Sequence, residues 1–280
     1  MIDSRISGLY KLSVTERIAR LRELGWLSAE DADCLRGGYH VLSAQAADHM
    51  IENTVGVFGM PFGVAPNFVV NGRECLVPLV VEEPSIVAGL SSAAAMARSQ
   101  GGFEVENDGS LLIGQVHVTD VADADHAIAA LEKAKPVLLD AANAVHPRLS
   151  DRGGGARDLE LRLFELPDGT PLIAVHVLVD TCDAMGANLV NSICEAIGPE
   201  IAAACEGNVA LRILSNLTDR SLYTARVRYE LPDDVRDAIV TVNNIALVDP
   251  YRAATHNKGV MNGVDAVAIA TGNDWRAIEA

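Results

Sequence analysis

Two short polar stretches near the end of the sequence hold residue types that could act together on a carbonyl group. The first runs from Asp249 to Gly263, and the second from Thr271 to Trp275. Lys258 and Asp274 stand here among glycines and asparagines. A lysine near a carboxylate can polarise a carbonyl oxygen and stabilise the alkoxide that forms on it. The alternative is a turn-rich surface loop, and residue types alone do not separate the two.

A third candidate is a pair of adjacent carboxylates at the end of an apolar run. Glu82 and Glu83 follow Cys75 to Val81 and precede Pro84 and Ser85. Burial at the end of a strand would raise the pKa of such a carboxyl group. A carboxyl group with a raised pKa can donate a proton near neutral pH. The alternative is a solvated helix start with Pro84 at the first helical position.

A junction in the middle of the chain is suited to a phosphate group. The segment from Val179 to Asn188 joins an apolar strand to a helix, and such a junction points backbone N–H groups at a ligand above the helix N-terminus. Gly186 is the single glycine of this segment, so the segment is not the G-x-G-x-x-G fingerprint of dinucleotide sites.

These stretches resemble the motifs of hydroxymethylglutaryl-CoA (HMG-CoA) reductase, class II, the soluble bacterial branch of that family. The matching segments are Glu52–Gly56, Asn71–Arg73, Val77–Ser85, Asp183–Asn188, Arg212–Asn216, Pro250–Gly259 and Thr271–Trp275. The resemblance covers nearly the whole chain. It implies interconversion of HMG-CoA with mevalonate and CoA by two hydride transfers, with NAD(H) or NADP(H) as cofactor.

The resemblance also implies roles for single residues. Lys258 would stabilise the developing oxyanion, Glu83 would donate protons, and Asp274 would tune both through shared hydrogen bonds. The residues that would hold the HMG carboxylate and hydroxyl are Ser85, Arg252 and Asn262. The loop residues that would hold the cofactor are Asp183, Met185, Gly186 and Asn188, and Asn216 would contact the HMG or nicotinamide region.

The order of elements in the middle of the chain indicates an inserted domain. Strands and helices alternate as β-α-β-β-α-β between Leu111 and Leu214, with a tight central hairpin at 167–170, which predicts a ferredoxin-like antiparallel domain. We expect this small domain at 109–219, within a large mixed helical and strand domain formed by 1–108 and 220–280, so the class is α+β. We expect a break or a kink at Pro136 in the first of its two helices and an interruption at Gly198–Pro199 in the second.

Local signals outline the first part of the large domain. Ser13 and Ser28 begin capping patterns that predict helices. The segment Met60–Asn67, with two prolines, is expected to be irregular. Asn71–Gly72 is a hairpin signal, and an alanine-rich helix should run from Ile86 to Ser99.

Composition limits the partners and the compartment. The 280 residues carry a formal charge of -16, which disfavours nucleic acid and anionic membranes, although a local site can still bind a phosphate-bearing cofactor. The five cysteines show no C-x-x-C spacing, which indicates free thiols rather than disulfides or a zinc site. No apolar run approaches the roughly 18 residues of a membrane span, and no signal peptide is evident. We predict a cytoplasmic protein without a metal ion.

Three departures from the family pattern bear on activity. The sequence ends at Ala280, before the expected C-terminal flap with its catalytic histidine, and none of the seven histidines obviously replaces that residue. The segment between Arg220 and Asp249 looks shorter than in the family. His146 stands where a carboxylate would accept the ribose 2′-hydroxyl of NAD. A residue that can carry a positive charge would suit the 2′-phosphate of NADP better. The choice between NAD(H) and NADP(H) stays open.

The family resemblance implies an obligate homodimer with the active site between the subunits. One alternative is a truncated or non-catalytic chain that still dimerises and binds the cofactor. Another is a different acyl-CoA or aldehyde oxidoreductase that uses the same site.

Overall fold

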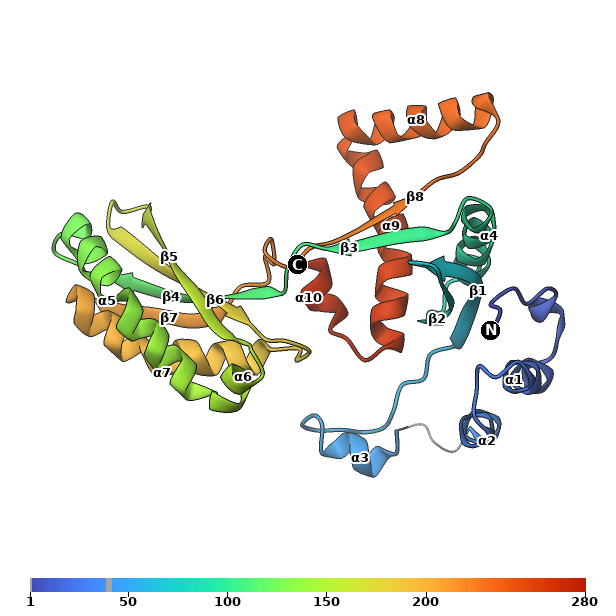
Figure 1. The fold of residues 1–280 in the computed structure, drawn as a ribbon, viewed down its shortest axis with the longest axis horizontal. Coiled ribbons are helices and arrows are strands. Elements are labelled where there is room, and N and C mark those ends of the chain that lie inside the picture. Colours follow the sequence, from blue (N-terminus) through green and yellow to red (C-terminus); the bar gives the residue numbers. More distant parts are fainter. Residues whose placement is uncertain (1, 39–41) are drawn as a thin grey trace. The chain divides into compact units, whose positions relative to one another are not determined.

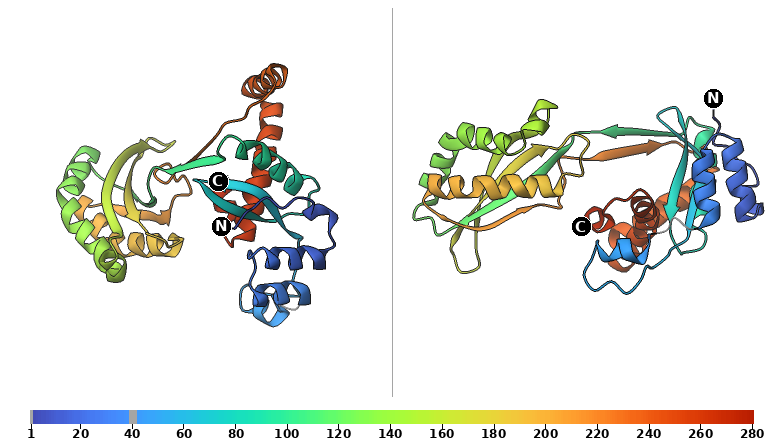
Figure 2. Two further views of the ribbon diagram at one scale, coloured as in Figure 1. Left: turned by 45° about the vertical axis from the view of Figure 1, so that its right-hand side comes forward. Right: turned by 90° about the horizontal axis from the view of Figure 1, so that it is seen from below.

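The chain folds into two compact units, seen in a computed structural model that describes residues 2–38 and 42–280 (Figures 1 and 2). Unit 1 combines Met1–Val105 with Ala225–Glu279, and unit 2 comprises Glu106–Thr224. Strands β3 (Phe103–Asn107) and β8 (Tyr223–Val227) run across the two boundaries along the chain. His40, one of the histidines considered above, lies outside the described residues.

Unit 1 contains most of the helices and one sheet. Its helices are η1 (Leu9–Lys11), α1 (Val14–Glu23), α2 (Ala29–Gly37), α3 (Ala44–Asp48), α4 (Ile86–Arg98), α8 (Asp233–Val248), α9 (Pro250–Ala270) and α10 (Trp275–Glu279). Its sheet has the order β2-β1-β3-β8, with β1 at Phe62–Val70 and β2 at Arg73–Val80. β1 is antiparallel to β2 and parallel to β3.

The hairpin between β1 and β2 confirms the prediction at Asn71–Gly72. Both residues have positive φ, 49° and 73°, as a two-residue turn that matches the strand twist requires. The Asn71 side chain bonds the backbone N–H and C=O of Val105 at 2.8 and 3.0 Å, which ties the turn to β3.

The prediction that Met60–Asn67 is irregular was wrong, because β1 already begins at Phe62. The register of β1 shifts between Ala65 and Phe68, and Asn67 adopts φ 77° there. Pro66 therefore falls in a bulge, where its missing N–H interrupts no ladder bond.

The N-terminal helices follow their local signals. Ser13 with Glu16, and Ser28 with Asp31, form complete capping boxes at the starts of α1 and α2. Both predictions are confirmed. Ile6, Leu9 and Leu21 then form a small cluster against apolar residues of β1 and β2.

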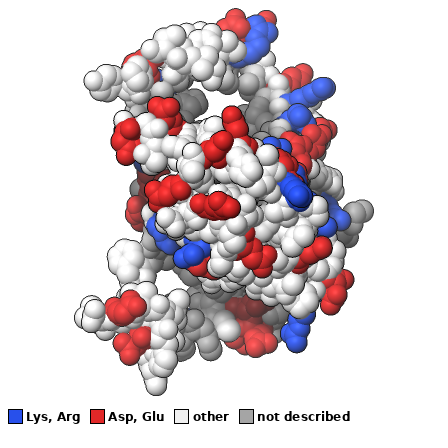
Figure 3. Space-filling model, turned by 90° about the vertical axis from the view of Figure 1, so that its left-hand side faces the viewer, with Lys and Arg blue, Asp and Glu red and all other residues white. Residues whose placement is uncertain are grey.

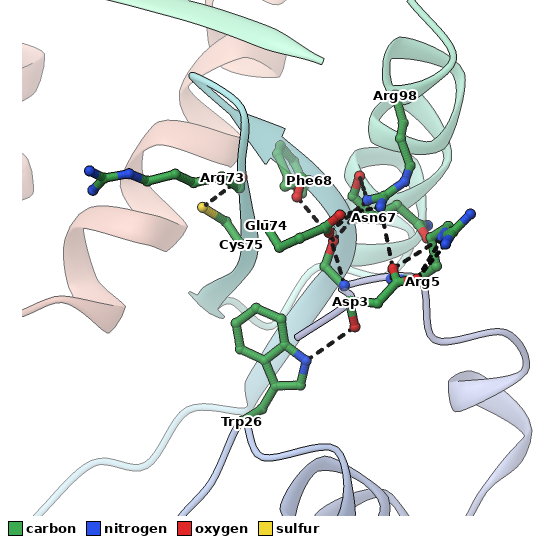
Figure 4. Close-up of polar contacts among 10 residues, drawn as sticks. Asp3, Arg5, Trp26, Asn67, Phe68, Arg73, Glu74, Cys75 and Arg98 are labelled. Carbon is green, nitrogen blue, oxygen red and sulfur yellow. Dashed lines mark hydrogen bonds and ion pairs between the residues drawn. The ribbon is translucent and has the colours of Figure 1, made fainter. Parts of the chain in front are cut away.

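A polar network fastens the N-terminal segment to the sheet (Figure 4). The fully buried Ser4 donates its hydroxyl to Glu74 at 2.5 Å and also to the Phe68 carbonyl at 3.0 Å. Arg98 of α4 binds the same carboxylate, at 2.8 Å through one nitrogen. The Arg98 guanidinium, aided by Ser4, lowers the pKa of Glu74 to about 2.

The polar stretch that begins at Asp249 is not a glycine-rich loop but the 21-residue helix α9. The Asp249 side chain accepts the Tyr251 N–H at 2.9 Å, and Pro250 occupies the first turn. These two N-terminal signals outweigh the helix-weakening glycines at 259 and 263. Near its other end, α9 buries Ala266 against Ala65 and Leu79.

Unit 2 has the predicted ferredoxin-like topology. Its elements are β4 (Leu111–Thr119), α5 (Ala124–Val145), α6 (Pro147–Asp151), β5 (Gly155–Glu165), β6 (Pro171–Asp180), α7 (Ala187–Cys205) and β7 (Asn208–Leu214). The sheet order is β5-β6-β4-β7, with every pair antiparallel. α5 and α7 pack on it and bury residues such as Leu131, Val177 and Ile197.

A break of α5 at Pro136 and an interruption of α7 at Gly198–Pro199 are both absent from the structure, so the predicted interruption of α7 was wrong, while a kink at Pro136 stays a prediction. α5 runs through Pro136, and α7 runs through Gly198 and Pro199. Leu138 beyond the first proline and Ile201 beyond the second are buried against the sheet. Packing on a shared core thus offsets the hydrogen bond that each proline removes from its helix.

The surface agrees with the acidic composition. Figure 3 shows Asp and Glu side chains scattered over the face that it presents. Among residues 2–38 and 42–280, no helix combines the length and the apolar character needed to cross a membrane.

Candidate active site

Lys258 and Glu83 lie together although 175 residues separate them in the sequence. The Lys258 Nζ donates to the Glu83 Oε2 at 2.5 Å. Lys258 belongs to α9, and Glu83 lies between β2 and α4. The contact follows from the cluster in which Ala266 of α9 packs with Leu79 of β2, and apolar residues of α4 pack against both.

The pair is accessible rather than buried. The Lys258 side chain is 61% exposed and the Glu83 side chain 44% exposed. Of the two alternatives considered for Glu82 and Glu83, burial at the strand end is thus not found, and the carboxylates are exposed. An exposed ion pair contributes little to stability, so both groups are available to a ligand.

Ser85 holds a strained backbone conformation beside this pair. It is the N-cap of α4 and has φ 75°, in the left-handed region. The helix begins at Ile86, so the predicted helical position of Pro84 was wrong. The Ser85 hydroxyl makes no hydrogen bond within the described part of the chain. Strain of this kind is found at ligand sites, where it fixes the direction of a side chain.

A cavity of 1390 Å³ in unit 1 reaches Glu83 and Ser85. Its walls include Asn67 of the β1 bulge and residues 5–10 of the N-terminal segment. Sequence reasoning missed the part played by this segment. No local sequence pattern predicts that residues 5–10 line the cavity, because this wall forms only when Ile6 and Leu9 pack on the sheet.

Asp274 and Asn262, two further residues predicted for the site, make no hydrogen bond to Lys258 or Glu83 among the described residues. Asp274 caps α10 by accepting the Arg276 and Ala277 N–H groups at 3.0 and 3.3 Å. Its carboxylate bonds neither Lys258 nor Glu83 among the described residues, so the shared network stays a prediction. Asn262 lies four residues after Lys258 and hence on the same face of α9.

Arg252 lies in the first turn of α9, half-buried. It makes no ion pair within 2–38 and 42–280. Its guanidinium therefore keeps its donors for a carboxylate ligand.

The predicted cofactor loop of unit 2 lies between β6 and α7. Gly186, at φ 81°, is the N-cap of α7, and no side chain of residues 2–38 or 42–280 caps this 19-residue helix. A Cβ at Gly186 would meet Thr181 at 2.6 Å and Leu112 at 2.8 Å, so only glycine fits. The first N–H groups of α7 are left for an anion, which fits a pyrophosphate.

The remaining cofactor candidates are accessible. Asp183, Met185 and Asn188 are exposed in the loop and the first turn of α7, and Asn216 is exposed in the segment after β7. His146, between α5 and α6, has a buried Nε2 without a hydrogen-bond partner among the described residues. The described chain contains no cluster of three or more residues that could hold a metal ion.

Comparison with known proteins decides the family. The sequence profile of hydroxymethylglutaryl-coenzyme A reductase matches residues 13–280. The chain belongs to this family. The resemblance stated from the motifs is confirmed.

Two relatives of the reductase family illustrate the extent of the match. The chain is 44% identical over 283 residues to the 3-hydroxy-3-methylglutaryl-coenzyme A reductase of Archaeoglobus fulgidus, and the match covers 100% of this chain and 64% of that protein. It is 33% identical over 245 residues to a probable enzyme of that name from Borreliella burgdorferi, with 83% of this chain and 54% of that protein covered. The chain thus spans less than two thirds of the length of either relative.

Solved structures confirm the α+β fold. The 3-hydroxy-3-methylglutaryl-coenzyme A reductase of Streptococcus pneumoniae matches with a TM-score of 0.93 at 40% identity, covering 98% of this chain and 75% of that chain. A structure of the class II enzyme from the same organism, bound to NADPH in open conformations, matches with a TM-score of 0.90 at 40% identity, covering 98% and 76%.

Proposed function

We propose that the chain catalyses the NAD(P)-dependent interconversion of HMG-CoA with mevalonate and CoA. The observation that carries this proposal is the 2.5 Å contact between Lys258 and Glu83 at the edge of a large cavity. It brings a lysine ammonium and a glutamate carboxylate together, the groups that we assign to oxyanion stabilisation and proton donation. The family membership supports the substrate class.

The chemistry requires charge stabilisation twice. Two reduced nicotinamides, bound one after the other, would supply the hydrides for the thioester carbon and, later, for the aldehyde carbon. Each transfer leaves negative charge on the former carbonyl oxygen, which the Lys258 ammonium stabilises. Glu83 donates the proton that neutralises it. The products in sequence are a hemithioacetal, mevaldehyde with released CoA, and mevalonate.

Ser85, Arg252 and Asn262 would hold the HMG part of the substrate. The Arg252 guanidinium, which has no ion pair in the part of the chain that the structure describes, can bind the HMG carboxylate through two hydrogen bonds. Asp274 would tune Lys258 and Glu83 through shared hydrogen bonds that form when substrate is bound.

The cofactor would lie on the loop before α7. Asp183, Met185, Gly186 and Asn188 would position it, with the pyrophosphate at the helix N-terminus. Asn216 would contact the HMG or nicotinamide region. A histidine at position 146, in place of a carboxylate, would suit a 2′-phosphate and hence NADP(H).

We also propose a homodimer, for which α8 supplies the physical support. This helix has no buried residue. Its exposed apolar residues are Val235, Ile239, Val240, Val242, Ile245, Leu247 and Val248. A helix that is apolar on most sides is normally covered. The cytoplasmic location stays a prediction.

An absorbance assay at 340 nm tests the function. The purified chain is given mevalonate, CoA and either NAD or NADP, in parallel with Lys258→Ala. Reduction of one cofactor that depends on Lys258 and on mevalonate would support the proposal and identify the cofactor. A folded chain that binds the cofactor without turnover would contradict it and favour a non-catalytic, cofactor-binding role. Turnover of other alcohols but not of mevalonate would point to a different oxidoreductase.

A further inference from the structure

Strand β5 contains one extra residue near the cofactor loop. Ala156 lies opposite Val179 of β6 and Asp158 lies opposite Leu178, so Arg157 has no partner position. This is a β-bulge, a feature that turns a side chain away from its regular direction and occurs often beside functional sites.

Side chains from α5 hold this bulge in place. Asn143 accepts the Ala156 N–H at 2.8 Å and donates to the Ala156 carbonyl at 3.0 Å. Asp158 accepts the Leu159 N–H at 2.9 Å and binds Lys135 at 2.6 Å. The polar groups around the bulge are thus satisfied, as expected of a built feature rather than a slip in register.

The bulge brings Arg157 to the end of β6. Its Nη2 donates to the Gly153 carbonyl and to Asp180 Oδ2, the latter at 3.1 Å. The other oxygen of Asp180 accepts the Cys182 N–H at 3.0 Å and the Ser110 hydroxyl at 3.3 Å. The Cys182 N–H, and next the Arg157 guanidinium, lower the pKa of Asp180, so this carboxyl stays ionised.

The loop that starts at Asp180 is fixed further along as well. The Ala184 N–H donates to the Thr181 carbonyl, and the Thr181 hydroxyl donates to the Ala184 carbonyl, both at 3.1 Å. Gly154 packs against the same loop, since a Cβ there would meet the Asp180 carbonyl and the Cys182 sulfur at 2.8 Å.

We propose that Arg157 is a positioning residue for the cofactor: through Asp180, it fixes the loop Thr181–Gly186 in the conformation that receives the dinucleotide. This inference rests on the proposed function. Arg157 also balances the charge of Asp180, which would otherwise repel the phosphates of a ligand at the start of α7.

The test compares Arg157→Ala with Arg162→Ala in the full chain. Arg162 is a matched control, because it is an arginine on the same strand with 43% of its side chain exposed, against 44% for Arg157. Its one ion pair among the described residues is with Glu160. We expect Arg157→Ala to raise the dissociation constant of the preferred dinucleotide about tenfold, the loss of one hydrogen bond to a charged group. Arg162→Ala should bind as the wild type does.

Two further measurements separate positioning from a general structural role. Arg157→Lys keeps the charge and should recover affinity to within about threefold of the wild type. In the 340 nm assay, Arg157→Ala should raise KM for the dinucleotide and leave kcat at saturation within about twofold. Equal effects of the two alanine variants, or a fall in kcat alone, would overturn the positioning role.

Hydrogen exchange gives a readout that needs no ligand. The amides of Cys182 and Ala184 should exchange faster in Arg157→Ala than in the wild type or in Arg162→Ala. Unchanged exchange would overturn the proposed coupling to the loop. If these amides exchange faster in Arg157→Ala but the wild type binds neither NAD(H) nor NADP(H), the coupling of Arg157 to the loop stands and the cofactor site is refuted.

Discussion

The two units build their predicted sites in opposite ways. In unit 1, the Lys258–Glu83 contact joins segments 175 residues apart and is widely exposed. In unit 2, the loop Thr181–Gly186 is shaped by its own turn and by the neighbouring strand ends. The first site therefore depends on how α9 packs against β2 and α4. The second depends on hydrogen bonds between nearby residues at the end of β6.

The largest expected effect is on the chemistry at the unit 1 contact. Lys258→Ala should lower kcat by about 10²–10³-fold, because it removes the charge that stabilises the oxyanion. Its exposure predicts an unchanged thermal unfolding midpoint. Lys133→Ala, an exposed lysine of α5, is the control for loss of a positive charge. Activity that survives in Lys258→Ala would remove Lys258 from the mechanism.

The docking of α9 can be weakened from its core. Leu79→Ala should destabilise unit 1 by about 2–5 kcal/mol, since Leu79 is fully buried against Ala65 and Ala266. Denaturant unfolding measures the loss, and the residual activity of the folded fraction shows whether Lys258 has moved. Leu131→Ala, in the core of unit 2, should cost a similar amount without this loss of activity. If both variants lose activity equally, the contrast between the units fails.

The cofactor loop should be sensitive to a single methyl group. Gly186→Ala adds a Cβ 2.6 Å from Thr181 at a positive φ, and should destabilise unit 2 by about 1–3 kcal/mol and weaken dinucleotide binding. Gly169→Ala shares the positive φ, 84°, but its Cβ meets nothing within 4 Å. Calorimetry on both variants separates backbone strain from steric overlap. Normal nucleotide affinity in Gly186→Ala would argue against this loop as the site.

The smallest expected effect is a pH dependence in unit 1. The pKa of Glu74 falls from 4.5 to about 2 on folding, chiefly through its hydrogen bonds with Arg98. Because the folded value lies below the unfolded one, the carboxylate stabilises the fold above pH 4.5, and this contribution is lost as the pH falls toward 2. Unfolding midpoints of Glu74→Gln and the wild type should therefore differ at pH 7 and converge in acid. A constant difference across that range would contradict the assignment, and the exposed Glu132→Gln serves as control.

Local sequence patterns alone predicted several helix starts, one turn and the order of elements in unit 2. The capping boxes of α1 and α2, the turn at Asn71–Gly72 and the β-α-β-β-α-β order all depend on neighbouring residues, and the structure contains each of them. The motif segments likewise carried the family resemblance, because they are contiguous in the sequence. Residue types at Lys258 and Glu83 allowed carbonyl chemistry without separating it from exposed surface positions, and the resemblance decided between them.

Only the tertiary structure decided how these parts meet. The passage of α5 and α7 through their prolines follows from packing on a core, and the bulge at Pro66 follows from the pairing of β1 in its sheet. The contact of Lys258 with Glu83 and the bulge that brings Arg157 to Asp180 have the same origin. Contacts between distant segments reflect the burial of shared apolar surface, which no short stretch of sequence contains by itself.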